Sequence, residues 1–245
     1  MESHTVLGVR IDNVTMEHMF REIKQAIEEN RKLIITPVNI RVVMEAQKDR
    51  ELFEMLKQSD INTPDSKQIC YLVKLRKFEF VERVTGADLF ANFPAFAAEH
   101  GIKIGIFGGF GSAEKAKTRI QKETGAKVVF TYSPMPEEVA NTSEKIIEQI
   151  NSASPNVLFV ALGCPKQELW IWKNYRKLSV NVLVSIGAGL DFYAGMQKRA
   201  PVWMQKTGIE WMGRLFGNPG KMAQRYLAEL KFYYEFLRET VREKR

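Results

Sequence analysis

Two charged side chains stand where this sequence could perform acid–base or phosphate chemistry. Asp65 follows a proline in the segment TPDS, after a short apolar run, and a carboxylate there could act as a general base. Arg83, in VERVTG, could hold a phosphate through its planar guanidinium group. Simpler explanations exist for both, because Pro-Asp-Ser is ordinary turn chemistry and a single arginine is more often part of a surface ion pair.

A glycine-rich segment is a further candidate contact for a phosphorylated ligand. GGFGS contains Gly108 and Gly109 and precedes a predicted helix, whose free N–H groups could bind a diphosphate. A plain tight turn would use the same residues. The segment is not a G-x-G-x-x-G sequence and lacks an acidic ribose partner, which disfavours an oxidoreductase that uses NAD or FAD.

The segment GCPKQE also allows two interpretations, a ligand contact or an ordinary helix start. Pro165 suits the first turn of a helix, and Lys166 and Gln167 would project from that helix start toward the strand ends, next to Gly163. The same residues are also an ordinary helix start. Two more polar segments belong to this group of candidate contacts: TPVN, with Thr36 and Asn39, and GAGLD, with Gly187 and Asp191.

The apolar pattern predicts the elements that must position these segments. Helical spacing over residues 14–29, with Thr15 as a possible cap, and over 40–57 predicts two helices. Apolar runs at 32–36 and 60–62 predict strands, and farther along strands alternate with helices of 10 to 15 residues. We therefore expect an α/β fold, a doubly wound and mostly parallel sheet whose ligand binds beyond the carboxyl ends of the strands. The later strands are predicted at 103–109, 127–132, 156–163 and 180–189, and the helices between them at 112–123, 142–151 and 165–177.

Composition limits which classes of protein the chain can belong to. A chain of 245 residues with 45% hydrophobic residues predicts one globular domain with an appendage, divided into 1–198 and 199–245 near the segment RAP. No apolar run is long enough to span a bilayer, and the N-terminus does not resemble a signal peptide, so we expect a cytoplasmic location. Histidines and cysteines are scattered, which predicts no metal site and no cofactor; the histidines are His4, His18 and His100, and the cysteines Cys70 and Cys164.

The positive charge is concentrated in the predicted appendage. Residues 196–245 hold 11 basic and 5 acidic side chains, against 25 and 24 in the rest of the chain. Basic and aromatic residues interleave there, which suits anionic lipid headgroups or nucleic acid; a helix pair docked on the body is the alternative. No nucleic-acid-reading motif is present, so no nucleic-acid partner is expected. An apolar stripe, Leu227, Leu230, Tyr234, Leu237 and Val241, could serve a subunit or core contact, and a homo-oligomer stays possible.

Taken in order, the motifs resemble those of the WecG/TagA/CpsF glycosyltransferases, glycosyltransferase family 26. The resemblance covers nearly the whole chain and is carried by TPVN, AQKD, TPD, ERVTGADL, GCPKQE, GAGLDFYAG, RAP, GIEWMGRL and NPGKMAQRYL. It implies a Rossmann-like, inverting, metal-independent enzyme that moves a sugar from a UDP-sugar to a polyprenyl-diphosphate-linked sugar in bacterial surface-polymer synthesis. It also implies an appendage that docks on the inner face of the cell membrane.

The resemblance assigns roles to individual residues. Asp65 matches the proposed catalytic base, Arg83 a phosphate ligand and Gln167 a pocket contact, while Thr36 and Asn39 would line the pocket. By motif, the appendage would deliver three basic residues to the active site: Arg214, Lys221 and Arg225.

The chain departs from the family pattern at three places. It has TPVN where the family has TPN, Ser66 where the family has glycine, and Lys221 where the family has arginine, which loses a bidentate fork. The donor sugar stays open among N-acetylmannosamine, which the motifs favour, its uronic acid, glucose and galactose. An inactive scaffold at the membrane or a basic nucleic-acid binder are the alternatives that involve no catalysis.

Overall fold

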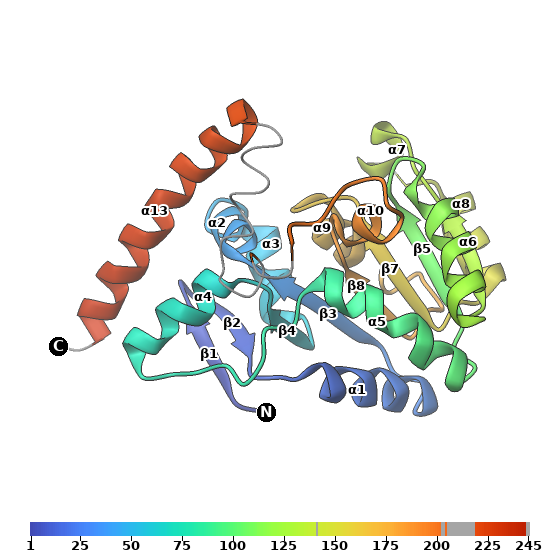
Figure 1. Ribbon diagram of the computed structural model, residues 1–245, viewed down its shortest axis with the longest axis horizontal. Coiled ribbons are helices and arrows are strands. Elements are labelled where there is room, and N and C mark those ends of the chain that lie inside the picture. The colour runs from blue at the N-terminus through green and yellow to red at the C-terminus, as the bar shows by residue number, and fades with distance from the viewer. Residues whose placement is uncertain (141, 202–203, 205–218, 244–245) are drawn as a thin grey trace.

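The core of the protein is one parallel sheet. A computed structural model describes residues 1–140, 142–201, 204 and 219–243. The six strands stand in the order β4-β3-β8-β7-β5-β6, and every neighbouring pair is parallel (Figure 1). Their bounds are β3 Leu33–Val38, β4 Ile61–Pro64, β5 Ile104–Gly108, β6 Val128–Tyr132, β7 Val157–Ala161 and β8 Val182–Ser185.

Helices cover both faces of the sheet, as the sequence predicts. Alternate residues of one strand belong to different cores: Ile34 lies in one apolar cluster and Ile35 in the other. The cluster with Ile35 contains residues of α1 (Met16–Glu28), α5 (Gly86–Glu99), α6 (Ser112–Thr124) and α10 (Gly189–Tyr193). The cluster with Ile34 contains residues of α2 (Ile40–Ala46), α3 (Arg50–Gln58), α8 (Glu144–Ala153), α9 (Lys166–Asn174) and α13 (Pro219–Glu243).

Local capping explains where the first helices begin and corrects one prediction. The Thr15 hydroxyl accepts from the backbone N–H of His18 at 3.1 Å, so the predicted cap of α1 is confirmed. The single helix predicted over residues 40–57 is wrong, since α2 and α3 are separate. Asp49 stands at the break and caps α3, because its carboxylate accepts from the backbone N–H groups of Glu51 and Leu52.

Several elements lie outside the predicted alternation. The chain begins with an antiparallel hairpin, β1 (Ser3–Val6) and β2 (Val9–Asp12). Between β4 and α5 run α4 (Lys67–Leu72) and the 3-10 helix η1 (Val73–Arg76), and α7 (Pro136–Ala140) precedes α8. The turn from β4 into α4 brings the segment TPDS to the carboxyl edge of the sheet.

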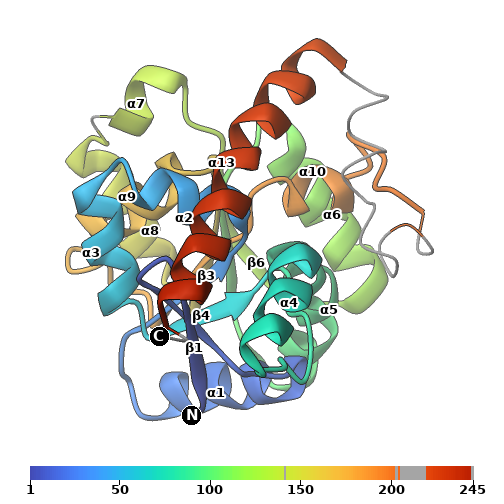
Figure 2. The same ribbon diagram turned by 90° about the vertical axis from the view of Figure 1, so that its left-hand side faces the viewer.

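The second half of α13 packs against the body of the protein (Figures 1 and 2). Phe232 and Phe236 are fully buried, and the Arg76 guanidinium lies 4.3 Å from the Phe236 ring centroid. The same guanidinium donates to Thr240 at 2.8 Å and forms an ion pair with Glu239 at 2.7 Å. These contacts fix this part of the helix to the end of η1.

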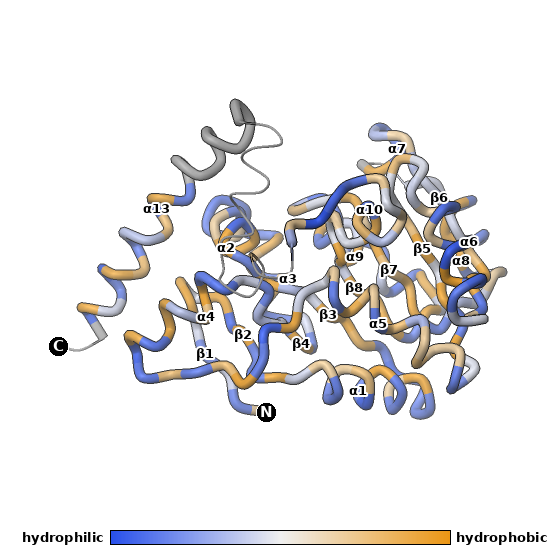
Figure 3. Tube along the Cα trace, viewed as in Figure 1, coloured by the Kyte–Doolittle hydropathy of each residue, from blue (hydrophilic) through white to orange (hydrophobic). Residues whose placement is uncertain are grey.

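The predicted apolar stripe of α13 faces outward. Leu230, Tyr234, Leu237 and Val241 are each about half exposed or more, so these residues make no core contact, whereas the Leu227 side chain lies outside the described residues. Figure 3 shows apolar residues along the inner strands and an alternation of apolar and polar residues along α13. Within the described parts of the chain, no helix has both the length and the apolar composition needed to span a bilayer.

Candidate active site

A cavity of about 300 Å³ opens at the carboxyl ends of β3, β4, β7 and β8. It lies where the sheet joins β3 to β8, which is where the strand order departs from the chain order, the position at which open α/β sheets bind ligands. Its lining includes Glu229 of α13, so the C-terminal segment reaches it. Of the predicted site residues, those in the lining are Asn39, Asp65, Arg83, Gly163, Gln167 and Gly187.

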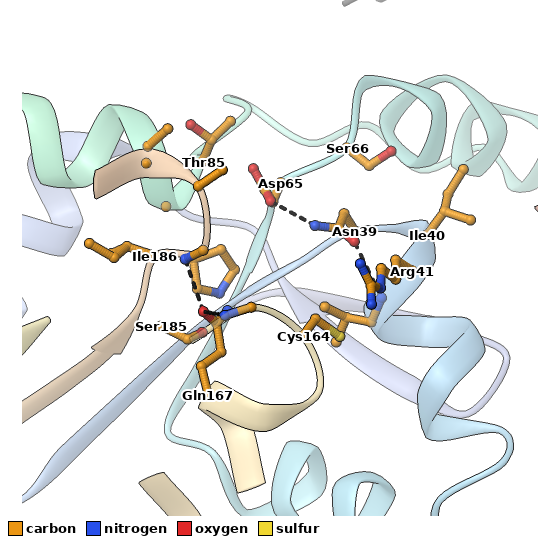
Figure 4. Close-up of a pocket in the computed structure, with 18 of the residues that line it drawn as sticks. Asn39, Ile40, Arg41, Asp65, Ser66, Thr85, Cys164, Gln167, Ser185 and Ile186 are labelled. Carbon is orange, nitrogen blue, oxygen red and sulfur yellow. Dashed lines mark hydrogen bonds between the residues drawn. The ribbon is translucent and has the colours of Figure 1, made fainter. Parts of the chain in front are cut away.

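Asn39 and Asp65 form a hydrogen-bonded pair at this edge (Figure 4). The Asn39 Oδ1 atom accepts from the backbone N–H of Val42 at 3.2 Å, because Asn39 caps α2, and this bond fixes the orientation of the amide. The Nδ2 atom therefore faces Asp65 and donates to its Oδ2 atom at 3.0 Å. The pair holds a half-buried carboxylate at the cavity wall, where it could accept a proton from a bound hydroxyl group.

Gln167 joins two strand-end loops. Its Oε1 atom accepts from the backbone N–H of Gly163, after β7, at 3.2 Å and from that of Gly187, after β8, at 3.0 Å. Figure 4 shows the side chain beside Ser185 on the wall opposite Asn39. Gln167 thus sets the relative position of both loops in addition to lining the cavity.

Asp88 contacts two of the arginines that line the cavity, Arg199 and Arg83. Its carboxylate lies 2.5 Å from Arg199 and 3.8 Å from Arg83, and it accepts from the hydroxyl of Thr85 at 2.7 Å. Burial alone would raise the pKa of Asp88, but the hydrogen bonds from Arg199 and Thr85 and the two positive charges outweigh it, and the pKa lies below its usual value. Asp88 stays charged at neutral pH and can orient both guanidinium groups.

Thr36 does not line the cavity, contrary to its predicted place. Its side chain is fully buried, 3.1 Å from the hydroxyl of Ser59. Successive side chains of a strand point to opposite faces, so the residue of β3 that reaches the cavity is Pro37. In TPVN, the residues that line the cavity are therefore Pro37 and Asn39.

The GGFGS segment lies outside the cavity lining as well. A side chain at Gly108 would place its Cβ atom 2.3 Å from the carbonyl oxygen of Ala161, so only glycine allows this approach of β5 to β7. The backbone N–H of Gly109 donates to the same carbonyl at 3.0 Å. Asp191, on α10, accepts from the hydroxyl of Ser112 at the start of α6. The polar groups named here are used within the protein, and the structure does not bring Gly108, Gly109 or Asp191 to the cavity.

The remaining predicted contacts are distributed differently. Pro165 precedes α9 as its cap residue, and Lys166 is exposed; neither lines the cavity. Arg214 lies outside the described residues. Lys221 and Arg225 lie on α13, with side chains outside the described residues, and Arg225 precedes the cavity residue Glu229 by one helical turn.

The cavity also contains residues that the sequence analysis did not select. Ser66, the departure from the family glycine, caps α4, since its hydroxyl accepts from the backbone N–H of Ile69 at 3.3 Å. Arg199 belongs to the RAP segment, where the appendage was expected to begin. Thr85 belongs to the motif ERVTGADL. For others no local signal exists, because only the fold brings them here: Arg41, Lys67 and Ser185. The described residues contain no group of three His, Cys, Asp or Glu side chains that could hold a metal ion.

A parallel α/β sheet with an aspartate held at the wall of a cation-lined cavity is typical of an enzyme that acts on an anionic substrate. Comparison with known proteins defines the class further. The model of the glycosyl transferase WecG/TagA/CpsF family matches residues 4–245, so the chain belongs to this family and is an enzyme.

Two curated relatives share one name, N-acetylglucosaminyldiphosphoundecaprenol N-acetyl-beta-D-mannosaminyltransferase. The relative from Bacillus subtilis (strain 168) is 30% identical over 229 residues, which cover 90% of this chain and 85% of the relative. The relative from Staphylococcus aureus (strain NCTC 8325 / PS 47) is 26% identical over 211 residues, with 85% and 82% covered.

Proposed function

We propose that this glycosyltransferase transfers N-acetylmannosamine, or a related hexose, from a UDP-sugar to a polyprenyl-diphosphate-linked sugar, with inversion and without a metal ion. The names of the two relatives support the sugar and the lipid-linked acceptor. The structural observation that carries the proposal is the Asn39–Asp65 pair at the wall of the cavity. A role in wall teichoic acid or another bacterial surface polymer follows from such an acceptor.

The chemistry assigns one role to each side of the cavity. The oxygen of the acceptor hydroxyl bonds to the anomeric carbon while Asp65 accepts the proton of that hydroxyl. The bond from the anomeric carbon to the UDP oxygen breaks. UDP leaves with the electron pair and gains negative charge. Arg83 and Arg199 line the same cavity and can stabilise that charge. Their guanidinium groups are already in place, so little side-chain rearrangement is needed as the charge develops. Arg214, Lys221 and Arg225 are proposed to add to them when the acceptor binds.

The direct test is transfer to a defined acceptor. We expect a product of the mass of the acceptor plus one N-acetylhexosamine when UDP-N-acetylmannosamine and a short-chain prenyl-diphosphate-N-acetylglucosamine are mixed with the full chain. UDP-glucose, UDP-galactose and UDP-N-acetylmannosaminuronic acid give the comparison for donor preference. A chelator in parallel reactions tests metal independence. Absence of product with every donor, for protein that is folded by circular dichroism, would reject the proposed reaction.

We also propose that the outward face of α13 lies on an anionic membrane surface, on the cytoplasmic side. Leu230, Tyr234, Leu237 and Val241 recur at helical spacing on this face. At 100° per residue the exposed cations, Lys231, Arg238 and Arg242, lie together along one edge of this stripe. Lys231 forms an ion pair with Glu235 at 3.5 Å, so Arg238 and Arg242 carry most of the charge of this edge. An apolar stripe with a basic edge is typical of helices that lie in a membrane interface.

Point substitutions test this surface better than truncation, because removal of α13 would also expose the sites of Phe232 and Phe236. We expect the chain to float with vesicles containing phosphatidylglycerol, and Leu237→Gln with Val241→Gln to reduce flotation strongly. Each interfacial cation contributes roughly 1 kcal/mol, so neutral phosphatidylcholine vesicles should bind less. If the double variant floats like the wild type but loses a dimer in light scattering, the stripe is a subunit contact. The division of the chain at residues 198 and 199 stays a prediction.

A further inference from the structure

Beneath the cavity lies a buried acidic residue that the proposed reaction does not use. Glu168 follows Gln167 on α9, and its side chain has no exposed surface. The Oε1 atom accepts from the Gln167 Nε2 atom at 2.7 Å. The Oε2 atom is buried without a hydrogen bond, although Ser185 is close enough to influence the carboxyl. A buried carboxyl with one oxygen bonded to a cavity residue and the other without a hydrogen bond needs an explanation, because burial of such a group costs free energy.

The hydrogen bonds of Gln167 determine which way its amide faces. Two backbone N–H groups, of Gly163 and Gly187, can only donate, so the atom that meets both must be the oxygen. The nitrogen is thereby directed toward Glu168. An amide nitrogen carries two hydrogens, and Glu168 accepts one of them.

We infer that Glu168 is a positioning residue, which fixes the Gln167 amide so that its second Nε2 hydrogen is presented to the cavity and receives an oxygen atom of the substrate. The inference rests on the proposed function, since that oxygen would belong to the UDP-sugar or to the acceptor glycan. A carbonyl, hydroxyl or phosphate oxygen satisfies the requirement, and a group that can only donate does not. Burial also raises the pKa of Glu168, and a neutral carboxyl still accepts from Gln167.

Conservative and disruptive variants of Glu168 separate positioning from packing. In Glu168→Gln, the new amide oxygen can still accept from Gln167, and we expect kcat and KM within about threefold of the wild type. In Glu168→Leu, the Oε1 atom keeps its two backbone N–H contacts but the Nε2 atom loses its partner, so the amide can turn about Oε1. We expect kcat/KM to fall by about 10- to 100-fold, the usual effect of an unsatisfied buried donor. Glu99→Gln, at an exposed position of α5, is the matched control and should change neither constant.

A side-chain exchange gives the sharpest test. In the double variant Gln167→Glu with Glu168→Gln, the carboxylate at 167 can accept from both glycine N–H groups and from the new amide at 168. The internal hydrogen bonds and the volume are kept, but the group presented to the cavity becomes an acceptor. We expect a melting temperature near that of Glu168→Gln and a rise in KM for the UDP-sugar or the acceptor of at least about tenfold. Retained KM values would overturn the inference, as would an equal loss in Glu168→Gln and Glu168→Leu.

A measurement without turnover separates this inference from the proposed reaction. If the wild type transferred no sugar, the reaction would be rejected, but the Gln167 amide could still be followed by nitrogen-15 NMR. We expect its side-chain hydrogens to exchange slowly with solvent in the wild type and in Glu168→Gln, and faster in Glu168→Leu. Equal exchange in all three proteins would show that Glu168 does not hold the amide. This readout also applies if Glu168→Leu has low activity because of reduced stability.

Discussion

Two glycine-containing turns at the carboxyl edge of the sheet look equally suited to bind a ligand, and they differ in how their polar groups are used. GCPKQE, after β7, supplies Gly163 and Gln167 to the cavity. GGFGS, after β5, stands beside the start of a 13-residue helix, which is the better anion site by local rules. Yet the cavity is formed by the ends of β3, β4, β7 and β8, and GGFGS does not line it.

The difference arises from contacts made outside the two segments. At GGFGS, the hydroxyl of Ser133 donates to the carbonyl oxygens of Gly108 and Gly109, and the Asp191 carboxylate stands by the start of α6. The Ser112 hydroxyl at the start of α6 therefore already has a partner within the protein. At GCPKQE, Gln167 is held from behind by Glu168 and keeps one face on the cavity. A strand-end turn is available to a ligand only when the rest of the fold leaves polar groups there unused.

The largest expected effect in the cavity is that of Asp65→Asn. This change keeps the volume and a hydrogen-bonding group but removes the base, so we expect kcat to fall by about 10²- to 10⁴-fold with little change in melting temperature. The measurement is product formation at saturating UDP-sugar and acceptor. Near-normal kcat would mean that another group accepts the proton, and Glu99→Gln serves as the control for an acid-to-amide change at a distant surface.

A smaller effect is expected where Asp88 orients the cations. Asp88→Asn weakens the contacts to Arg199 and Arg83, and we expect the KM for the UDP-sugar to rise by about tenfold, the usual range for a charge-assisted hydrogen bond. Arg83→Lys keeps the charge but loses the fork, and its KM should lie between those of Arg83→Gln and the wild type. An unchanged KM in Asp88→Asn would show that the cations hold their places without it.

Because Glu168 is buried, we expect the stability of the protein to depend modestly on pH. Since burial raises the pKa of Glu168, its favourable contribution to folding is present below the ordinary value of 4.5 and is lost as pH rises through the folded pKa. Glu168→Gln cannot ionise, so its free energy of unfolding relative to the wild type should increase as pH rises above that value. Urea unfolding of both proteins at several pH values measures this. A difference that is constant with pH would contradict the raised pKa.

The smallest effect on activity is expected at GGFGS. Because Asp191 and Ser112 satisfy each other outside the cavity, Asp191→Asn and Ser112→Ala should leave kcat and KM within about twofold of the wild type. Each should lower the free energy of unfolding by roughly 0.5 to 1 kcal/mol, because each weakens the hydrogen bond between Ser112 and Asp191. Steady-state kinetics and thermal unfolding measure the two quantities. A tenfold loss of activity would place this turn in the active site and remove the contrast with GCPKQE.

The sequence alone determined the class of fold and the family. Alternating apolar runs and amphipathic segments require a parallel sheet covered on both faces, because each element must bury its apolar side. The polar residues that follow those runs then have to meet at the carboxyl edge, which is why Asn39, Asp65 and Gln167 are found around one cavity. Arg83, predicted from its residue type and motif as a phosphate contact, lines the same cavity. The motif order was enough to indicate the family whose model matches residues 4–245.

Only the tertiary structure decided which strand ends share the cavity and which way each side chain points. The order β4-β3-β8-β7-β5-β6 places β8 beside β3 and leaves β5 and β6 at the far side, and no local pattern encodes that order. Thr36 points away because a one-residue difference along a strand reverses the face. Asp88 and Asp191 act through partners 111 and 79 positions away in the chain, and such contacts exist only after the chain has folded.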